Sequence, residues 1–197
     1  MQKVFGIGLP KTGTTSLIKA LNMIGLRIGF YYKNYPINIF KVENGKCVLC
    51  PNALKNVDAL ADLPVTFFYK ELDKLFPGSK FILTHREIES WIKSCSNNLW
   101  TGKFLPGNHR INRLHEEFFG TKTFDEKLFR KAYYRHLDDV RQYFKGRDDL
   151  LEFDLSQDNK WEALSEFLDL PAPDEQFPIS NKAKSRVIRD IKRKLFS

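Results

Sequence analysis

A short polar segment near the N-terminus carries the residues best suited to binding an anion. Residues 8–17 read GLPKTGTTSL, a loop of glycine, lysine and hydroxyl side chains. An apolar run, Val4–Ile7, precedes the loop, and apolar residues at helical spacing follow from Leu17. The order strand, tight turn, helix leaves backbone N–H groups pointing outward at the positive end of a helix dipole. The pattern therefore predicts a phosphate-binding loop.

The loop differs from the common nucleotide-binding loop in the position of its lysine. In the pattern G-x-x-x-x-G-K-[ST], the lysine serves the β- and γ-phosphates of a triphosphate. Gly8 and Gly13 keep the spacing of the two glycines, but Thr14 stands at the lysine position and Lys11 lies inside the loop. We therefore expect a different kind of phosphate donor.

An arginine at the end of a second apolar run is placed to complete the site. The run Phe81–Thr84 is followed by His85 and Arg86, and Ser94 lies on the polar side of the next predicted helix. Ligands of open α/β sheets sit outside the carboxyl ends of the strands, so Arg86 should face the loop. A guanidinium group binds phosphate through two parallel hydrogen bonds, and a serine hydroxyl can complete such a cradle.

The motif PKTGTTS resembles the 5′-phosphosulfate loop of the sulfotransferases, which use 3′-phosphoadenosine-5′-phosphosulfate as donor. The pair Arg86 and Ser94 resembles the element that binds the 3′-phosphate in that family. The resemblance implies 3′,5′-adenosine bisphosphate as product and a hydroxyl or amine as acceptor. Further segments are similar to compact members of the family: 58–64, 68–72, 76–84, 161–168 and 177–181.

The resemblance also implies a set of donor-binding residues, with Lys11 neutralising charge on the leaving phosphate. The implied set is Pro10, Lys11, Thr12, Gly13, Thr14, Thr15, Ser16, Arg86 and Ser94, with Lys182 and Lys184 of the basic C-terminal segment. The C-terminal residues have a second interpretation, a solvated helix docked by its apolar side. Sulfuryl transfer resembles in-line phosphoryl transfer, in which positioning and electrostatics do most of the work. The implied arrangement requires no metal.

The resemblance also implies which residue removes the proton from the hydroxyl substrate. Many family members place a histidine in an H-L-P motif at a strand end, and the matching triplet here is Asp62-Leu63-Pro64. Asp62 is then the general base, although a reference pKa of ~3.9 makes it weak unless burial raises that pKa. Asp62 could instead be the N-cap of a helix that opens at Pro64 and Val65.

Four histidines compete with Asp62 for the role of base. His85 is the candidate next to Arg86. His109 and His115 fall in a segment that we interpret as a substrate lid, and we expect His136 on a helix surface.

Strand and helix patterns alternate along the chain, which favours an α/β fold with a parallel sheet. We expect one domain over residues 1–197, a three-layer sandwich of the P-loop-like sulfotransferase type with about five strands. The strand candidates are 4–8, 27–31, 58–61, 80–84 and 150–153. Apolar stripes predict helices at 17–24, 88–99, 128–144 and 161–168. Residues 33–56 and 101–122 look irregular, and a basic helix is expected over 182–196.

Composition sets broad limits on the function. The 197 residues are 42% hydrophobic and include 17 Phe, enough for a core, and no apolar run reaches membrane-spanning length. The start, Met1-Gln2-Lys3, leads straight into a strand and leaves no room for a signal peptide, and three cysteines argue against a disulfide framework. We therefore expect a cytoplasmic protein. The pair Cys47 and Cys50 lacks the second pair that a structural zinc site needs.

The net charge of +8 is not accompanied by any nucleic-acid-binding motif, and a donor with several negative charges accounts for a basic cleft. Two other functions stay open: a P-loop kinase of a small molecule, and a non-catalytic nucleotide-binding module. The displaced lysine argues against the kinase, but Asp62 at a strand end keeps it possible. The presence of Lys11, Arg86 and Ser94 argues against a module without activity.

Overall fold

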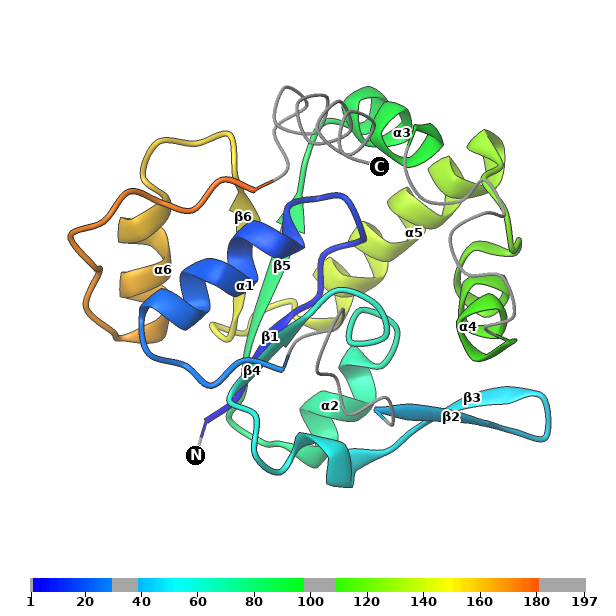
Figure 1. Cartoon of the computed structure of the whole chain (residues 1–197), viewed down its shortest axis with the longest axis horizontal. Coiled ribbons are helices and arrows are strands. Elements are labelled where there is room, and N and C mark those ends of the chain that lie inside the picture. The colour runs from blue at the N-terminus through cyan, green and yellow to red at the C-terminus, as the bar shows by residue number, and fades with distance from the viewer. Residues whose placement is uncertain (1, 30–38, 98–108, 181–197) are drawn as a thin grey trace, which may run out of the picture.

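A parallel four-stranded sheet forms the centre of the computed structural model, which describes residues 2–29, 39–97 and 109–180 (Figure 1). The strand order is β4-β1-β5-β6. The strands are β1 (Val4–Gly6), β4 (Ala59–Ala61), β5 (Lys80–His85) and β6 (Leu150–Asp154). The register pairs Val4 with Ala59 on one side and with Lys80 on the other. Because these strands are parallel, β1, β4 and β5 end at the same edge of the sheet, and the segments that follow them lie close together.

Residues 27–31, one of the five predicted strands, do not form a strand in the described part of the chain. Ile28 forms an isolated parallel bridge with Ala59, and residues 30–38 lie outside the described residues. The backbone N–H groups of Asp58 and Ala59 both donate to the carbonyl of Arg27, at 2.8 and 3.2 Å. This shared acceptor stands where a regular ladder would use one carbonyl for each N–H.

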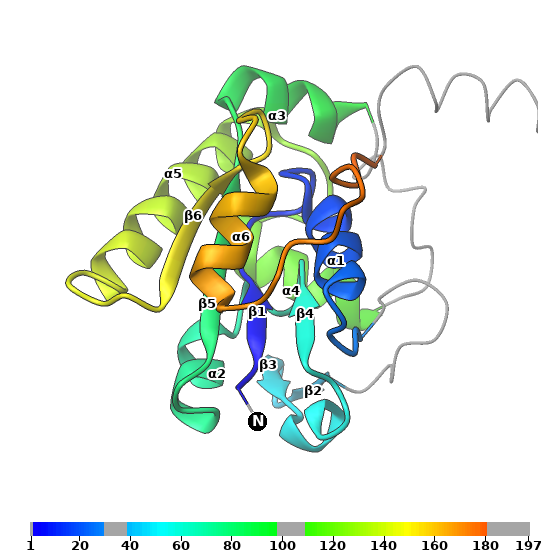
Figure 2. The ribbon, with the colours of Figure 1, turned by 90° about the vertical axis from the view of Figure 1, so that its left-hand side faces the viewer.

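Side chains of the strands alternate between two cores, one on each face of the sheet. Phe81 and Leu83 of β5 join the larger core, and Ile82 between them joins the smaller one. Helices α1 (Thr14–Met23) and α6 (Lys160–Leu168) cover the smaller core (Figure 2). The larger core lies under α2 (Tyr69–Leu75), α3 (Ile88–Ser96), α4 (His109–Phe119) and α5 (Glu126–Tyr143). The predicted three-layer α/β arrangement is confirmed.

The stripes that predicted four helices correspond to α1, α3, α5 and α6. In α5 the stripe residues Phe129, Leu137 and Val140 are buried as the periodicity required. Asp125 caps this helix, since its carboxylate accepts a hydrogen bond from the backbone N–H of Leu128 at 2.9 Å. Each fully buried large apolar side chain contributes about 1.5–3 kcal/mol of hydrophobic stabilisation.

The expectation that residues 33–56 are irregular is wrong for their described part. They contain a hairpin of β2 (Phe40–Glu43) and β3 (Lys46–Leu49), followed by the short 3-10 helix η1 (Pro51–Leu54). Asn44 and Gly45 form the turn with φ of 49° and 73°, the two positive values that a two-residue hairpin needs.

Residues 101–122, expected to be an irregular lid, contain helix α4 from His109 to Phe119. This helix packs on the hairpin, and there Glu117 accepts a hydrogen bond from the N–H of Cys47 at 3.0 Å. Residues 98–108 lie outside the described residues, as does the segment 181–197 with its predicted basic helix, Lys182 and Lys184. None of the helices in the described ranges is long and apolar enough to cross a membrane.

Candidate functional site

The loop between β1 and α1 collects backbone N–H groups at the carboxyl edge of the sheet (Figure 1). The first helical hydrogen bonds of α1 run from Ser16 and Leu17 to the carbonyl of Gly13, at 2.9 and 3.0 Å. The N–H groups of Gly13, Thr14 and Thr15 have no acceptor among the residues that the structure describes. They are the orphan donors of a helix N-terminus, the geometry that binds an anion.

Two glycines make the tight loop possible. Gly13 has a φ of 106°, and a Cβ there would lie 2.0 Å from the Cδ1 of Leu155. A Cβ on Gly8 would lie 1.9 Å from the Oγ1 of Thr84 and 2.4 Å from the carbonyl oxygen of Thr84. The sequence spacing of the two glycines therefore has a steric cause at each position.

Two residues at the carboxyl edge of the sheet have a positive φ, which is unfavourable for any residue other than glycine. Lys11 has a φ of 74° and Asp62 a φ of 79°. The other described non-glycine residues with positive φ are Asn44, in the hairpin turn, and Asp169, at the end of α6, where such values are ordinary. Strained backbone concentrates at functional sites, so this geometry singles out Lys11 and Asp62 independently of any sequence motif.

Asp62 directly follows β4 and is joined to the loop through Thr14. The Thr14 hydroxyl donates to Asp62 Oδ2 at 2.8 Å, and the Leu63 N–H donates to Oδ1 at 2.8 Å. Burial raises the pKa of the Asp62 carboxyl, while these two hydrogen bonds and the charge of Lys11 oppose the rise. The result is a carboxylate that is held at the mouth of the loop and is more basic than an ordinary aspartate.

The alternative role of Asp62 as a helix N-cap is wrong. Residues 64–67 form a turn, and α2 begins only at Tyr69. The carboxylate oxygens accept from Thr14 and Leu63, and neither of these hydrogen bonds caps a helix that follows.

Two residues of the predicted donor-binding set, Thr12 and Ser16, have hydroxyls that bond to the protein itself. Thr12 donates from Oγ1 to the carbonyl of Leu9 at 2.7 Å, so the 2.7 Å contact with Thr84 Oγ1 must be donated by Thr84. Ser16 accepts a hydrogen bond from the N–H of Ser180 at 2.9 Å, which docks the end of the described chain on α1. Thr12 closes the loop, and Ser16 anchors a distant segment.

Arg86 reaches back from the end of β5 to the loop. Its Nη1 donates to the carbonyl of Lys11 at 3.3 Å, and its Nη2 bonds to the hydroxyl of Ser90. Ser94 lies one turn further along α3 and is half-buried. The structure thus brings Arg86, Ser90 and the loop together, as the sheet topology predicted, and it adds Ser90 as the direct partner of the guanidinium.

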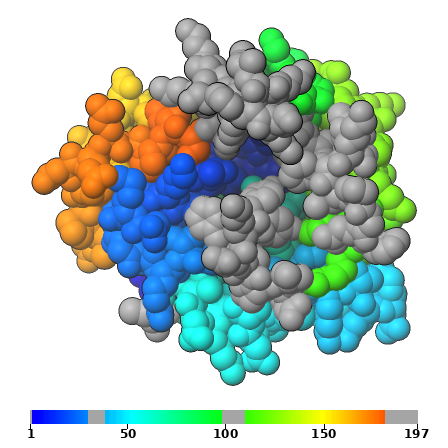
Figure 3. Space-filling view, in the orientation of Figure 1, coloured from blue at the N-terminus to red at the C-terminus, as the bar shows by residue number. Residues whose placement is uncertain are grey.

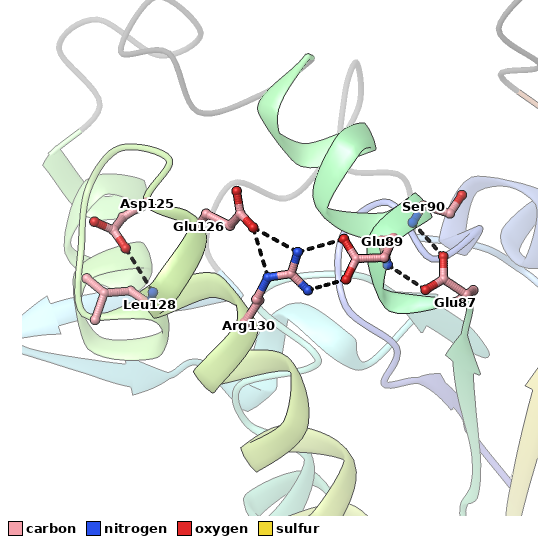
Figure 4. Close-up of polar contacts among 7 residues, drawn as sticks. All are labelled: Glu87, Glu89, Ser90, Asp125, Glu126, Leu128 and Arg130. Carbon is pink, nitrogen blue, oxygen red and sulfur yellow. Dashed lines mark hydrogen bonds and ion pairs between the residues drawn. The ribbon is translucent and has the colours of Figure 1, made fainter.

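Helix α3, which carries these serines, is fixed at its first turn (Figure 4). Glu87 caps it by accepting from the N–H groups of Glu89 and Ser90, both at 2.7 Å. Arg130 of α5 donates to both carboxylate oxygens of Glu89, at 2.6 and 2.7 Å, and also to Glu126. Exposed ion pairs contribute little alone, about 0–1 kcal/mol each, but this bidentate geometry fixes the direction in which α3 leaves β5.

The histidines are distributed differently from expectation. His85 lies on the β6 side of the edge, with its Nε2 3.9 Å from the Oε2 of Glu152. The expectation that His136 lies on a helix surface is wrong, since it is 3% exposed and its Nε2 lies 2.7 Å from the carbonyl oxygen of Ile7. Burial lowers the pKa of His136 to about 4 and the pKa of His115 to about 3. His109 begins α4.

The cysteines carry free thiols, and burial raises the pKa of Cys47 to about 11. Within the described ranges, no group of three or more His, Cys, Asp or Glu side chains is placed to hold a metal ion.

Comparison with known proteins gives a family match over most of the chain. A family profile described as "Sulfotransferase domain" matches residues 3–186. A protein of Aspergillus versicolor named "Ava biosynthesis cluster protein M" is 28% identical over 217 residues, an alignment that covers 89% of this chain and 79% of the relative.

The two buried histidines predict a pH dependence of stability. Their folded-state pKa values of about 3 and 4 lie below the ordinary value of 6.5, so the unfolded chain binds more protons as the pH falls below about 6.5. We expect the free energy of unfolding to decrease by on the order of 1.4 kcal/mol per pH unit for each histidine, from about pH 6 to pH 4. Urea titrations across this range measure the slope.

The control variant is His136→Gln, which keeps an N–H donor for the carbonyl of Ile7 but cannot be protonated. It should remove its share of the slope above about pH 5, where carboxylates still keep their charge in both states. An unchanged slope would contradict the assignment.

Proposed function

The chain belongs to the sulfotransferase family, and we propose that it transfers a sulfuryl group from 3′-phosphoadenosine-5′-phosphosulfate to a hydroxyl or amine acceptor. The observation that carries the proposal is the hydrogen bond from Thr14 to Asp62. It joins the anion-binding loop to a carboxylate, so that a donor group and a base can meet at one point.

The loop has the donor set that a phosphosulfate group requires. The N–H groups of Gly13, Thr14 and Thr15 converge at the start of α1, and Thr15 is half-buried there. Lys11 precedes them in the loop and supplies a positive charge. Arg86 and α3 flank the loop on the β5 side and offer a second cationic cradle for the 3′-phosphate. Thr12 is part of the donor-binding set that the sequence implied, but its backbone N–H donates to the carbonyl of Leu9 at 3.2 Å and closes the loop instead.

The two strained residues divide the chemistry between them. Lys11 would stabilise the charge that builds on the bridging oxygen as its bond to sulfur breaks. Asp62 would take the proton of the acceptor hydroxyl as the new sulfur–oxygen bond forms. The raised pKa of Asp62 suits this role, because a more basic carboxylate has a greater driving force for proton uptake. The acceptor must then approach from the β4 side of the loop.

A small-molecule kinase is the second candidate that a specific observation favours. An aspartate at a strand end, bonded to a loop hydroxyl, is also an arrangement that holds Mg²⁺ in P-loop enzymes. Family membership and the position of Lys11 favour sulfuryl transfer over this alternative.

The donor is tested by calorimetry with 3′,5′-adenosine bisphosphate, AMP and ATP, each with and without Mg²⁺. We expect the bisphosphate to bind without Mg²⁺ and far more tightly than AMP, because each phosphate has its own cradle. Equal affinity for AMP would remove the 3′-phosphate site, and tighter Mg²⁺-dependent binding of ATP would favour the kinase. A labelled-sulfate transfer assay across a panel of hydroxyl and amine acceptors then separates an enzyme from a binding module.

Lys11→Ala should lower the rate of the chemical step by about 10²-fold or more while changing bisphosphate affinity less. The change keeps a side chain at the strained position, so the loss reports the charge rather than the backbone. Single-turnover transfer rates measure it. Lys19→Ala, which removes an exposed charge from α1, the helix that follows the loop, is the matched control. A change confined to the donor KM would make Lys11 a binding residue only.

Asp62→Asn should abolish transfer to hydroxyl acceptors and leave the fold and bisphosphate binding intact. Asparagine tolerates positive φ as aspartate does, and its oxygen can still accept from Thr14 or Leu63. Asp169→Asn makes the same substitution at the positive φ that ends α6 and should be silent. Full activity of Asp62→Asn would refute the base and direct attention to the histidines.

A further inference from the structure

The carbonyl oxygens of five consecutive loop residues are each engaged by a side chain. Residues 7–11 follow β1 and enter the turn that leads to α1. The oxygen–donor distances are 2.7 Å or slightly more for four of the contacts and 3.3 Å for the fifth. The pairs, acceptor first, are Ile7 with His136 Nε2, Gly8 with Thr66 Oγ1, Leu9 with Thr12 Oγ1, Pro10 with Trp91 Nε1 and Lys11 with Arg86 Nη1.

These donors come from separate parts of the fold. Thr66 lies in the turn after β4, Trp91 on α3 and His136 on α5. The three are separated from their acceptors by 58, 81 and 129 residues. Only the packed tertiary structure brings them to one side of the loop.

The arrangement decides which polar groups of the loop face a ligand. A trans peptide is planar, so its N–H points away from its carbonyl oxygen. Where a side chain holds the carbonyl oxygen on one side, the N–H of the same peptide therefore points to the opposite side. This applies to the carbonyls of Ile7, Gly8 and Pro10, because the Leu9 peptide has no N–H before Pro10 and the N–H in the Lys11 peptide, that of Thr12, donates to Leu9. Carbonyl oxygens carry partial negative charge and would repel an anion, whereas N–H groups attract it.

We propose that Trp91, Thr66 and His136 are positioning residues of the donor site, which hold the loop carbonyls away from the bound anion. The proposal rests on the proposed function, because the anion is the donor's phosphosulfate. The three side chains are 0%, 0% and 3% exposed, so they touch the loop and not the donor. Any effect on binding must pass through the backbone they hold.

Trp91 is the most informative of the three. Its ring is fixed by Phe129 and Tyr133, whose ring centroids lie 5.9 and 4.9 Å away, so the direction of its N–H is set by packing. The N–H meets the carbonyl of Pro10 at 2.8 Å, in the peptide whose N–H belongs to Lys11. Trp91 therefore orients the peptide that leads into the catalytic lysine.

The test pairs each variant with a matched change elsewhere. Trp91→Phe removes the ring N–H and keeps an aromatic side chain. Trp161→Phe removes the equivalent bond on α6, from the ring N–H to the Glu175 carbonyl at 2.7 Å. Thr66→Val removes the buried hydroxyl, and its control Ser79→Ala removes a buried hydroxyl bonded to Phe76 at 2.6 Å.

We expect calorimetry to show bisphosphate binding weakened roughly tenfold in Trp91→Phe and Thr66→Val, and unchanged in both controls. The wild-type titration keeps the two hypotheses apart. If wild-type protein does not bind the bisphosphate, the proposed donor fails. If wild-type binds and the folded Trp91 and Thr66 variants bind equally well, the positioning role is overturned.

A measurement on unmodified protein covers variants that fail to fold. Charge at the inner N–H should polarise the peptide and strengthen the hydrogen bond on its outer side. In ¹H–¹⁵N spectra, the indole resonance of Trp91 should move downfield on addition of bisphosphate, and that of Trp161 should not. A Trp91 resonance that stays in place at saturating bisphosphate overturns the proposal.

Discussion

One constraint governs the loop between β1 and α1. Several backbone N–H groups must point to one side of the loop while the carbonyl oxygens point to the other. A helix N-terminus supplies three such groups at Gly13, Thr14 and Thr15. The preceding turn must then place its carbonyls elsewhere, which it does at the cost of a positive φ at Lys11. Such a conformation costs a non-glycine residue about 1–2 kcal/mol and persists because surrounding packing fixes it. The conformation of the loop therefore depends on the packing of the larger core, which holds the side chains that bond to the loop carbonyls.

The same edge joins the loop between β1 and α1 to a carboxylate. β4 pairs directly with β1, so the residue that follows β4 lies beside the loop that follows β1. Asp62 takes the Thr14 hydroxyl as donor and stays close enough to Lys11 for the lysine charge to lower its pKa against the effect of burial. The Asp62 carboxylate is therefore tied to the loop, and its pKa is raised by burial and lowered in part by Thr14, Leu63 and Lys11.

Local patterns predicted the elements whose signals are long or chemically distinct. The apolar stripe of α5 and the glycine spacing at 8 and 13 correspond to real elements. The hairpin at 40–49 was missed although Asn44-Gly45 is a strong turn signal, because its short strands alternate weakly and are mostly exposed. The described part of the strand expected at 27–31 forms only a bridge at Ile28, next to Arg27, whose carbonyl accepts from two N–H groups and whose guanidinium pairs with Asp58.

The sequence by itself determined the α/β class, the glycine-rich loop between β1 and α1, the positions of Arg86 and Asp62 after strand ends, and the family, because these rest on spacing within short segments. Only the tertiary structure decided what each polar side chain does. It assigned Thr12 to closing the loop and Ser16 to docking Ser180, and it buried His136 against the carbonyl of Ile7. The physical reason is that a hydrogen bond between residues 7 and 136 depends on how two layers pack, and no local pattern encodes that.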